Sequence, residues 1–254
     1  MAAPTTFDLL WGTHQRPRRG PKPSLTLERI VTEAIALADA EGLANLSMQH
    51  LAERLGCAKM ALYRYVPGKA ELVALMVDAA LGDAPQPLAP TGRPVQAGRP
   101  VQTDQAAAPG EPSWRAVLRL WATTIFDRYR AHPWSIEASA GARPTGPNEM
   151  AWMETALGVL AGTGLTGPER LDAVVLLNGH VRSLVQVTAA GQQDLEAEIA
   201  RQVGAALSAN PGRYPQVLAA FSGSPPSAGR DNALQFGIDR ILDGLAALIA
   251  ARSA

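Results

Sequence analysis

Apolar residues recur at α-helical spacing along most of the chain, and this periodicity limits the fold more than any other feature. Alternating stretches of β-branched and aromatic residues, which are typical of half-buried strands, are absent, and aromatic residues make up only 5%. Glycine and proline interrupt the helical pattern, which predicts separate helices joined by turns. The sequence therefore predicts an all-α protein, and its 254 residues are enough to bury a sizeable core.

Residues 24–82 contain four expected helices, which cover residues 27–41, 48–55, 58–65 and 70–81. Thr26 and Ser47 precede the first two helices, and their hydroxyls can accept hydrogen bonds from free N–H groups of the first turn. Gly42 is expected to form the left-handed cap that ends the first helix. Pro67 and Gly68 break the chain before the fourth helix. The segment is therefore predicted to form a small helical domain.

The second and third expected helices have the spacing of a helix-turn-helix. Ala52 is small enough for two helices to approach closely, Gly56 permits the positive φ of a tight turn, and Leu62 packs one helix onto the other. Cys57 takes an inward position in this arrangement, which favours a small core residue over a redox thiol. Another kind of three-helix unit could carry the same residues, so the spacing alone leaves both interpretations open.

The same segment carries longer motifs: TLERIVxxAIxLADxEGL, then LSMxxLAERLG, then ALYRYV, with Lys69 at the start of the next helix. With these motifs, residues 24–82 resemble the DNA-binding domain of the tetracycline-repressor (TetR/AcrR) family of bacterial transcription regulators. The C-terminal region contains WRxxLRxW, HPW and FGIDRILDGL, and it resembles the all-α regulatory domain of the subgroup closest to the tetracycline repressor. The resemblance implies an N-terminal helix-turn-helix domain followed by a larger helical domain that binds a ligand and dimerises.

The resemblance also implies DNA contacts at matching positions. Ser47, Tyr63 and Lys69 would bind phosphate oxygens, with Lys69 beside the positive N-terminal end of its helix. Tyr65 is expected to pack against the domain, and His50 is expected to be an exposed helix residue. Glutamine can read adenine, lysine can read guanine, and alanine can touch a thymine methyl group. The residues that would approach bases or share the outward face of the short helix are Gln49, Lys59, Met60, Ala61 and Arg64.

Charge is unevenly distributed, although the 23 basic and 23 acidic residues balance. Residues 44–70 carry four basic residues and one acidic residue, and residues 14–23 carry four basic residues and no acidic one. The second of these patches belongs to a basic N-terminal arm, residues 1–23. Its Arg16, Arg18 and Arg19 either form a solvated tail or enter the adjacent minor groove, as homeodomain arms do. Balanced charge therefore does not exclude DNA binding, and it predicts weak non-specific binding.

Residues 83–112 are rich in proline, glycine and alanine and repeat the sequence GRPVQ, which predicts a linker. Helical periodicity returns over residues 113–254, the expected ligand-sensing and dimerisation domain. Asn148 and Thr166 are predicted N-caps, and Thr166 forms a capping box with Glu169. The expected helices of this domain cover residues 114–132, 149–162, 168–189, 194–208, 215–221 and 231–251.

The two longest expected helices, 168–189 and 231–251, carry apolar residues on more than one side. Such helices are either buried within one subunit or form a four-helix bundle between two subunits, and the family resemblance favours the bundle. A homodimer would place two recognition helices about one DNA turn (~34 Å) apart, which matches a palindromic operator. Double-stranded DNA and a second copy of the chain are therefore the expected partners.

Polar residues within the apolar stripes of the larger domain indicate a candidate ligand site, because burial of an unpartnered polar group is unfavourable. Asn178 is expected to face inward, and Arg182 is a further candidate on the same helix. For every candidate, and for His132 and His180, core packing is the competing interpretation. The aromatic and soft apolar candidates are Trp121, Phe126, Trp134, Met150, Trp152 and Met153.

These features predict a ligand-responsive, sequence-specific transcriptional regulator, and the resemblance implies a repressor that a small molecule of unknown identity releases from its operator. An all-α enzyme is an alternative, but the sequence has no paired-carboxylate motif, nucleophile elbow or phosphate loop. A nucleoid-type DNA binder without a ligand is another. Metal-ligand clusters, a signal peptide and membrane-spanning runs are also absent from the sequence. We therefore expect no metal or cofactor, no membrane association and a cytoplasmic location.

Overall fold

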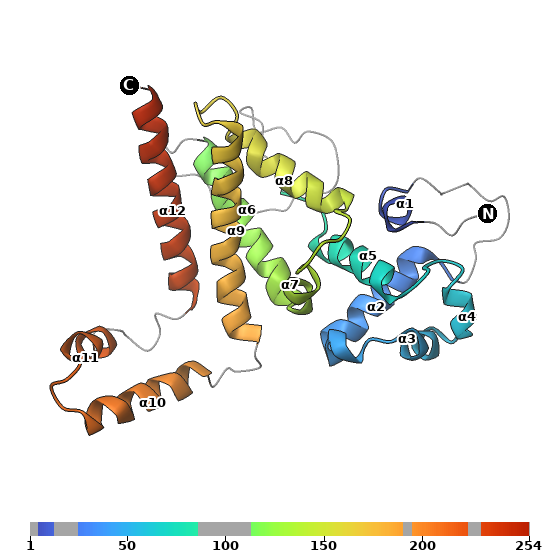
Figure 1. Cartoon of the computed structure of the whole chain (residues 1–254), viewed down its shortest axis with the longest axis horizontal. Coiled ribbons are helices and arrows are strands. Elements are labelled where there is room, and N and C mark those ends of the chain that lie inside the picture. Colours follow the sequence, from blue (N-terminus) through green and yellow to red (C-terminus); the bar gives the residue numbers. More distant parts are fainter. Residues whose placement is uncertain (1–4, 13–24, 86–112, 190–194, 223–229, 254) are drawn as a thin grey trace.

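The computed structural model describes residues 5–12, 25–85, 113–189, 195–222 and 230–253, and these residues form helices and turns without strands (Figure 1). This confirms the all-α prediction. The described helices, in chain order, are α1 (Thr6–Leu10), α2 (Leu27–Glu41), the 3-10 helix η1 (Leu43–Asn45), α3 (Met48–Leu55), α4 (Lys59–Leu62), α5 (Lys69–Leu81), α6 (Ser113–Ala131), α7 (Trp134–Ala138), α8 (Pro147–Val159), α9 (Gly167–Ala189), α10 (Leu195–Ala209), α11 (Pro215–Ser222) and α12 (Arg230–Ser253).

Three predicted helix starts have the expected caps. The Thr26 hydroxyl accepts a hydrogen bond from the N–H of Arg29 at 3.1 Å, and the Ser47 hydroxyl accepts one from His50 at 3.1 Å. At the start of α9, the N–H of Thr166 donates to the Glu169 carboxylate at 2.8 Å. These caps were predictable because donor and acceptor lie within three residues of each other.

Two predicted caps are wrong in detail. Gly42 has a positive φ of 83° but a ψ of 155°, which lies outside the left-handed helical region, so it leads into η1 and is not the predicted left-handed cap. Asn148 is not the N-cap of α8, because Gly146 takes that position and Asn148 lies within the first turn. The acceptor for the first turn of α8 is the carboxylate of Asp78, which comes from α5.

Two short helices, α1 and α7, had no counterpart in the prediction. The prediction assigned residues 1–23 to an arm, but Thr6–Leu10 form a helix whose Leu10 is buried against the N-terminal core. It also ended a helix at Pro133, whereas Pro133 caps α7. Each helix has only five residues, which is too short to show a periodicity. Residues 86–112 of the predicted linker lie outside the described residues.

Two hydrophobic cores organise the described chain. The first lies among α1 to α5 and includes Ile30, Leu37 and Leu62, all of them fully buried. The second lies among α6, α8, α9 and α12. Trp134 of α7 packs into the first core although it follows α6 in the chain, and Ala84, just after α5, packs into the second. Helix α5 therefore lies between α2 on one side and α7 and α8 on the other (Figure 1).

Helices α10 and α11 lie apart from both cores in Figure 1, beyond the lower end of α9. Helix α11 has no buried residue. Large apolar side chains on the segment containing these helices are 41% to 54% exposed: Ile199, Tyr214, Val217, Leu218 and Phe221.

Candidate functional site

The helix-turn-helix has the packing that the spacing predicts. Ala52 and Leu62 are buried, 1% and 0% exposed, where α3 and α4 pack against each other and against the N-terminal core. Gly56 between them has φ 65° and ψ 35°, the left-handed conformation that a side chain disfavours. Cys57 is half-buried and packs against the same core. Helix α4 is therefore held on a rigid support with one face free.

Most of the residues predicted to contact DNA are exposed, on or near α3, α4 and the start of α5. Seven of the eight predicted residues of this region are exposed: Ser47, Gln49, Lys59, Met60, Tyr63, Arg64 and Lys69. Met60 is 72% exposed. Ala61, the eighth, is half-buried and packs against the N-terminal core. The methyl group of Ala61 is therefore less accessible to a base than the predicted outward position implies.

Two of the exposed residues have protein partners on the same surface. The Gln49 amide donates a hydrogen bond to Glu53 at 2.7 Å, and the Lys69 ammonium donates to the carbonyl of Leu43 at 3.3 Å. Both hydrogen bonds are exposed to solvent, so phosphate or base atoms can replace them with little loss of free energy. Tyr65 packs against the N-terminal core as expected, and its hydroxyl donates a hydrogen bond to the Leu25 carbonyl at 2.8 Å. The arginines predicted in the arm, Arg16, Arg18 and Arg19, lie outside the described residues.

Helix α5 is joined to α8 through Asp78, a carboxylate that is only 6% exposed. Its Oδ1 accepts hydrogen bonds from the backbone N–H groups of Asn148 at 3.0 Å and Glu149 at 3.1 Å. The Asn148 side chain returns a hydrogen bond to the Asp78 carbonyl at 2.9 Å. Burial raises the pKa of Asp78 above its ordinary value, although the two N–H donors oppose this shift. The first turn of α8 thus depends on a residue of the DNA-binding part.

An ion pair lies beside Asp78 within the C-terminal part, and three polar contacts connect the two parts. Arg143 and Glu149 form a two-point ion pair beside Asp78, with N–O distances of 2.7 and 2.5 Å. Trp11, after α1, donates its indole N–H to the Thr145 carbonyl at 3.2 Å. Trp134 of α7 donates to Asp39 of α2 at 2.6 Å, and His132 Nδ1 lies 2.9 Å from the same oxygen.

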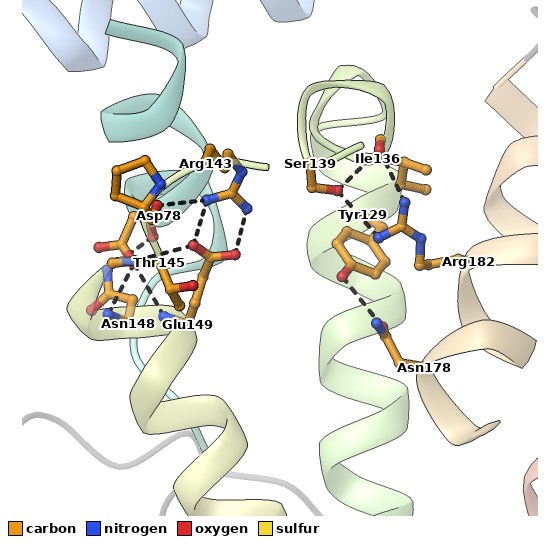
Figure 2. Close-up of polar contacts among 12 residues, drawn as sticks. Asp78, Tyr129, Ile136, Ser139, Arg143, Thr145, Asn148, Glu149, Asn178 and Arg182 are labelled. Atoms are coloured by element: carbon orange, nitrogen blue, oxygen red, sulfur yellow. Dashed lines mark hydrogen bonds and ion pairs between the residues drawn. The ribbon is translucent and has the colours of Figure 1, made fainter. Parts of the chain in front are cut away.

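A cavity of about 180 Å³ lies at this junction, with walls from α5, α6, α8, α9 and the α7 region. On the α6–α9 side, Tyr129 donates its hydroxyl to Asn178 at 3.3 Å, and burial raises the pKa of this phenol. Arg182 donates to the Ser139 hydroxyl at 3.2 Å and to the Ile136 carbonyl at 3.1 Å. Figure 2 shows this group on one side and the Asp78–Arg143–Glu149 group on the other. The lining residues are Val77, Ala80, Leu81, Arg128, Tyr129, Ser135, Ser139, Arg143, Glu149, Asn178 and Arg182.

Of the eight ligand-site candidates, the cavity brings together Asn178 and Arg182. Trp121 and Trp152 lie in the second core, where their indole N–H groups donate to the carbonyls of Trp152 and Gly82, both at 2.9 Å. The other four candidates are not among the lining residues either. Phe126 is buried in the second core, Trp134 is buried in the first, and Met150 and Met153 are 45% and 40% exposed.

The sequence did not predict the other polar residues of the cavity wall, which are Arg128, Tyr129, Ser135, Ser139, Arg143 and Glu149. Tyr129 follows Ile125 and Phe126 at helical spacing on the apolar face of α6. Its hydroxyl on this face could therefore have predicted a polar group at a buried site. Arg143 lies in a loop, and its place depends on Glu149 and on Asp78 in another part of the chain. His180, another candidate for core packing, lies against Gly237 of α12 with Nε2 3.2 Å from the Leu234 carbonyl.

The described residues contain neither a metal-ligand cluster nor a membrane-spanning helix. Among these residues, no group of three His, Cys, Asp or Glu side chains is placed to hold a metal ion. None of the described helices is long and apolar enough to cross a bilayer.

Comparison with known proteins identifies the two parts of the chain. Residues 30–76 match the family described as bacterial regulatory proteins, tetR family, and residues 106–249 match the tetracyclin repressor-like C-terminal domain. The HTH-type transcriptional repressor DrrR1 of Streptomyces coeruleorubidus is 38% identical over 97% of this chain and 87% of its own.

Two solved structures of ActR from Streptomyces coelicolor have similar folds. Apo ActR has a TM-score of 0.70 and 24% identity, covering 91% of this chain and 99% of ActR. ActR in complex with actinorhodin has a TM-score of 0.69 and 25% identity, covering 89% of this chain and 97% of ActR. The chain therefore belongs to the tetR family of bacterial regulatory proteins, and it is a ligand-responsive DNA-binding transcriptional regulator and not an enzyme.

Proposed function

We propose that the chain acts as a homodimeric repressor, which leaves a palindromic operator when a small molecule enters the junction cavity. One observation carries the proposal: Val77, Ala80 and Leu81 of α5 line the cavity, and α5 also packs in the core of the helix-turn-helix domain. A ligand in the cavity would therefore contact the domain that binds DNA. Its target is DNA, so we expect the protein to act in the cytoplasm.

For DNA binding, we propose that α4 enters the major groove. Lys59 and Gln49 would contact bases, while Ser47, Tyr63 and Lys69 would bind phosphates on either side. The exposure of these side chains supports the assignment. The remaining candidates for this interface are Met60, Ala61 and Arg64 on or beside α4, and Arg16, Arg18 and Arg19 in the arm.

For dimerisation, we propose that α9 and α12 form a four-helix bundle with the same helices of a second copy. Each helix packs one face against the second core and leaves apolar side chains exposed on another, which supports this role. Gly179 of α9 and Gly244 of α12 have open space where a side chain would lie, which permits close approach of helices. The exposed apolar residues are Leu171, Val175 and Leu176 on α9, and Phe236 and Leu248 on α12.

The proposed response follows from linkage between the two sites. A ligand that fits the cavity better in one position of α5 shifts the population toward that position. Because α5 begins at Lys69, immediately after the helix-turn-helix, a shift of α5 changes the separation of the two recognition helices in the dimer. Ligand and DNA must then weaken each other's binding by the same factor.

Fluorescence anisotropy with labelled DNA from beside the protein's own gene tests the proposal. We expect binding to this DNA to persist at physiological salt in excess random competitor DNA. We also expect a compound that binds in the cavity to lower this affinity. The first probes are compounds of about the size of benzene, which match a cavity of about 180 Å³. Equal affinity for random DNA would refute the proposed function.

A further inference from the structure

The charges that line the junction cavity are unbalanced. Its ionisable lining consists of three arginines, one glutamate and one tyrosine. Arg143 and Glu149 neutralise each other through their two-point ion pair. The other nearby carboxylate, Asp78, accepts hydrogen bonds from the first turn of α8. Arg128 and Arg182 remain, and neither has a carboxylate partner among the described residues.

Arg182 is held in a fixed orientation by neutral acceptors. Its two terminal nitrogens donate to the Ser139 hydroxyl and the Ile136 carbonyl, as Figure 2 shows. A guanidinium has five N–H donors and stays charged at every physiological pH, so Arg182 keeps both charge and donor capacity for a ligand. An arginine with its plane already fixed loses little side-chain entropy when it binds a planar acid group.

The neighbouring groups also favour an acceptor. Burial raises the pKa of Tyr129, so this phenol is neutral and protonated at physiological pH. The Asn178 amide and the Ser135 hydroxyl complete this wall with further neutral donors. Opposite them, Val77, Ala80 and Leu81 of α5 offer an apolar surface. The cavity thus has a cationic, donor-rich side and an apolar side.

We propose that the effector is a small organic acid, whose carboxylate binds the guanidinium of Arg182 with Arg128 nearby and whose apolar body packs on α5. A cavity of about 180 Å³ accommodates a body of about one aromatic ring, since a cavity of ~150 Å³ holds benzene. This inference rests on one part of the proposed function, which is that the effector binds in the junction cavity. It predicts a preference of at least about tenfold for an acid over its neutral amide, because the amide cannot make charge-assisted hydrogen bonds.

Isothermal titration calorimetry on the full chain without DNA tests the inference. The probes are three matched pairs at millimolar concentration: benzoate and benzamide, salicylate and salicylamide, hexanoate and hexanamide. We expect at least one acid to bind about tenfold more tightly than its amide. Arg182→Gln and Arg128→Gln should each remove this preference. Arg130→Gln, an exposed position on α6 outside the lining, should keep it.

Three results would overturn the inference: no acid binds, the amides bind as tightly as the acids, or both cavity variants keep the preference. Thermal unfolding shows whether each variant is folded, and the two variants lie on different helices, so failure of one leaves the other to decide. The DNA-binding assay is independent of these titrations. Loss of specific DNA binding with intact acid selectivity would refute the proposed function alone, and the converse would refute this inference alone.

Discussion

The contact between α5 and α8 makes a quantitative prediction about Gly146. Its φ of −86° is available to any residue, but an added Cβ would overlap the Asp78 carboxylate and lie 2.7 Å from the Asp78 Cβ. Gly146→Ala therefore must displace the acceptor for the first turn of α8. Loss of a helix cap lowers the free energy of unfolding by about 1 kcal/mol, and each buried N–H group left unpaired lowers it by about 1 to 3 kcal/mol. We expect Gly146→Ala to lower the free energy of unfolding by about 2 to 4 kcal/mol.

A double-mutant cycle isolates the cause. Asp78→Ala alone should be destabilising by a similar amount, because the same two N–H groups lose their acceptor. Once Asp78 is removed, Gly146→Ala should add less than about 1 kcal/mol, so the two effects are strongly non-additive. Gly158→Ala is the matched control, since it lies in α8 with open space at its Cβ and should stabilise by about 0.5 to 1 kcal/mol. Urea unfolding measures all four variants, and additive effects at positions 78 and 146 would refute the reasoning.

Four further predictions concern pH, DNA, assembly and packing. Burial raises the pKa of Asp78, so folding favours the protonated carboxyl group. The contribution of Asp78 to the free energy of unfolding is therefore complete below its ordinary pKa of about 3.9, and it declines as the pH rises through the higher pKa of the folded protein. The stability advantage of the native protein over Asp78→Asn should therefore shrink from about pH 4 upward. A constant difference in urea unfolding across this range would contradict it. Lys59→Gln should weaken operator binding and lower the slope of log K against log salt by about 1, whereas Arg213→Gln, far from α4 in sequence, should leave both unchanged. Val175→Asp, at a position 68% exposed in one chain, should halve the mass found by sedimentation while the monomer stays folded. A mass unchanged from that of the native protein would count against the bundle. Gly237→Ala should lower stability by about 1 to 3 kcal/mol, because an added Cβ overlaps the His180 ring between α9 and α12. An unchanged melting temperature would show that the ring can move aside.

The sequence predicted the features that depend on neighbouring residues. Thr26, Ser47 and Thr166 cap helices by contacts within three residues, and the helix-turn-helix spacing places Ala52 and Leu62 in one small core. Long amphipathic helices were predictable for the same reason, since their periodicity is local.

Features that depend on distant residues were missed or misassigned. Asn148 was a reasonable N-cap by type, but Asp78, 70 residues earlier, provides the acceptor. Trp121 and Trp152 are predicted as aromatic lining of the ligand site, yet they are buried in the second core, where their indole N–H groups donate to the carbonyls of Trp152 and Gly82. Arg182 is predicted as a ligand-site residue, but Ile136 and Ser139, which orient it, are not, because the sequence does not predict α7.

Footprinting on the DNA beside the protein's own gene, combined with the mass of the complex, tests the central claim most directly. A dimer that presents two copies of α4 predicts two protected half-sites about one helical turn (~34 Å) apart, with two protein chains bound to each DNA duplex. A single protected half-site with one chain per duplex, or uniform protection without sequence preference, would contradict the account.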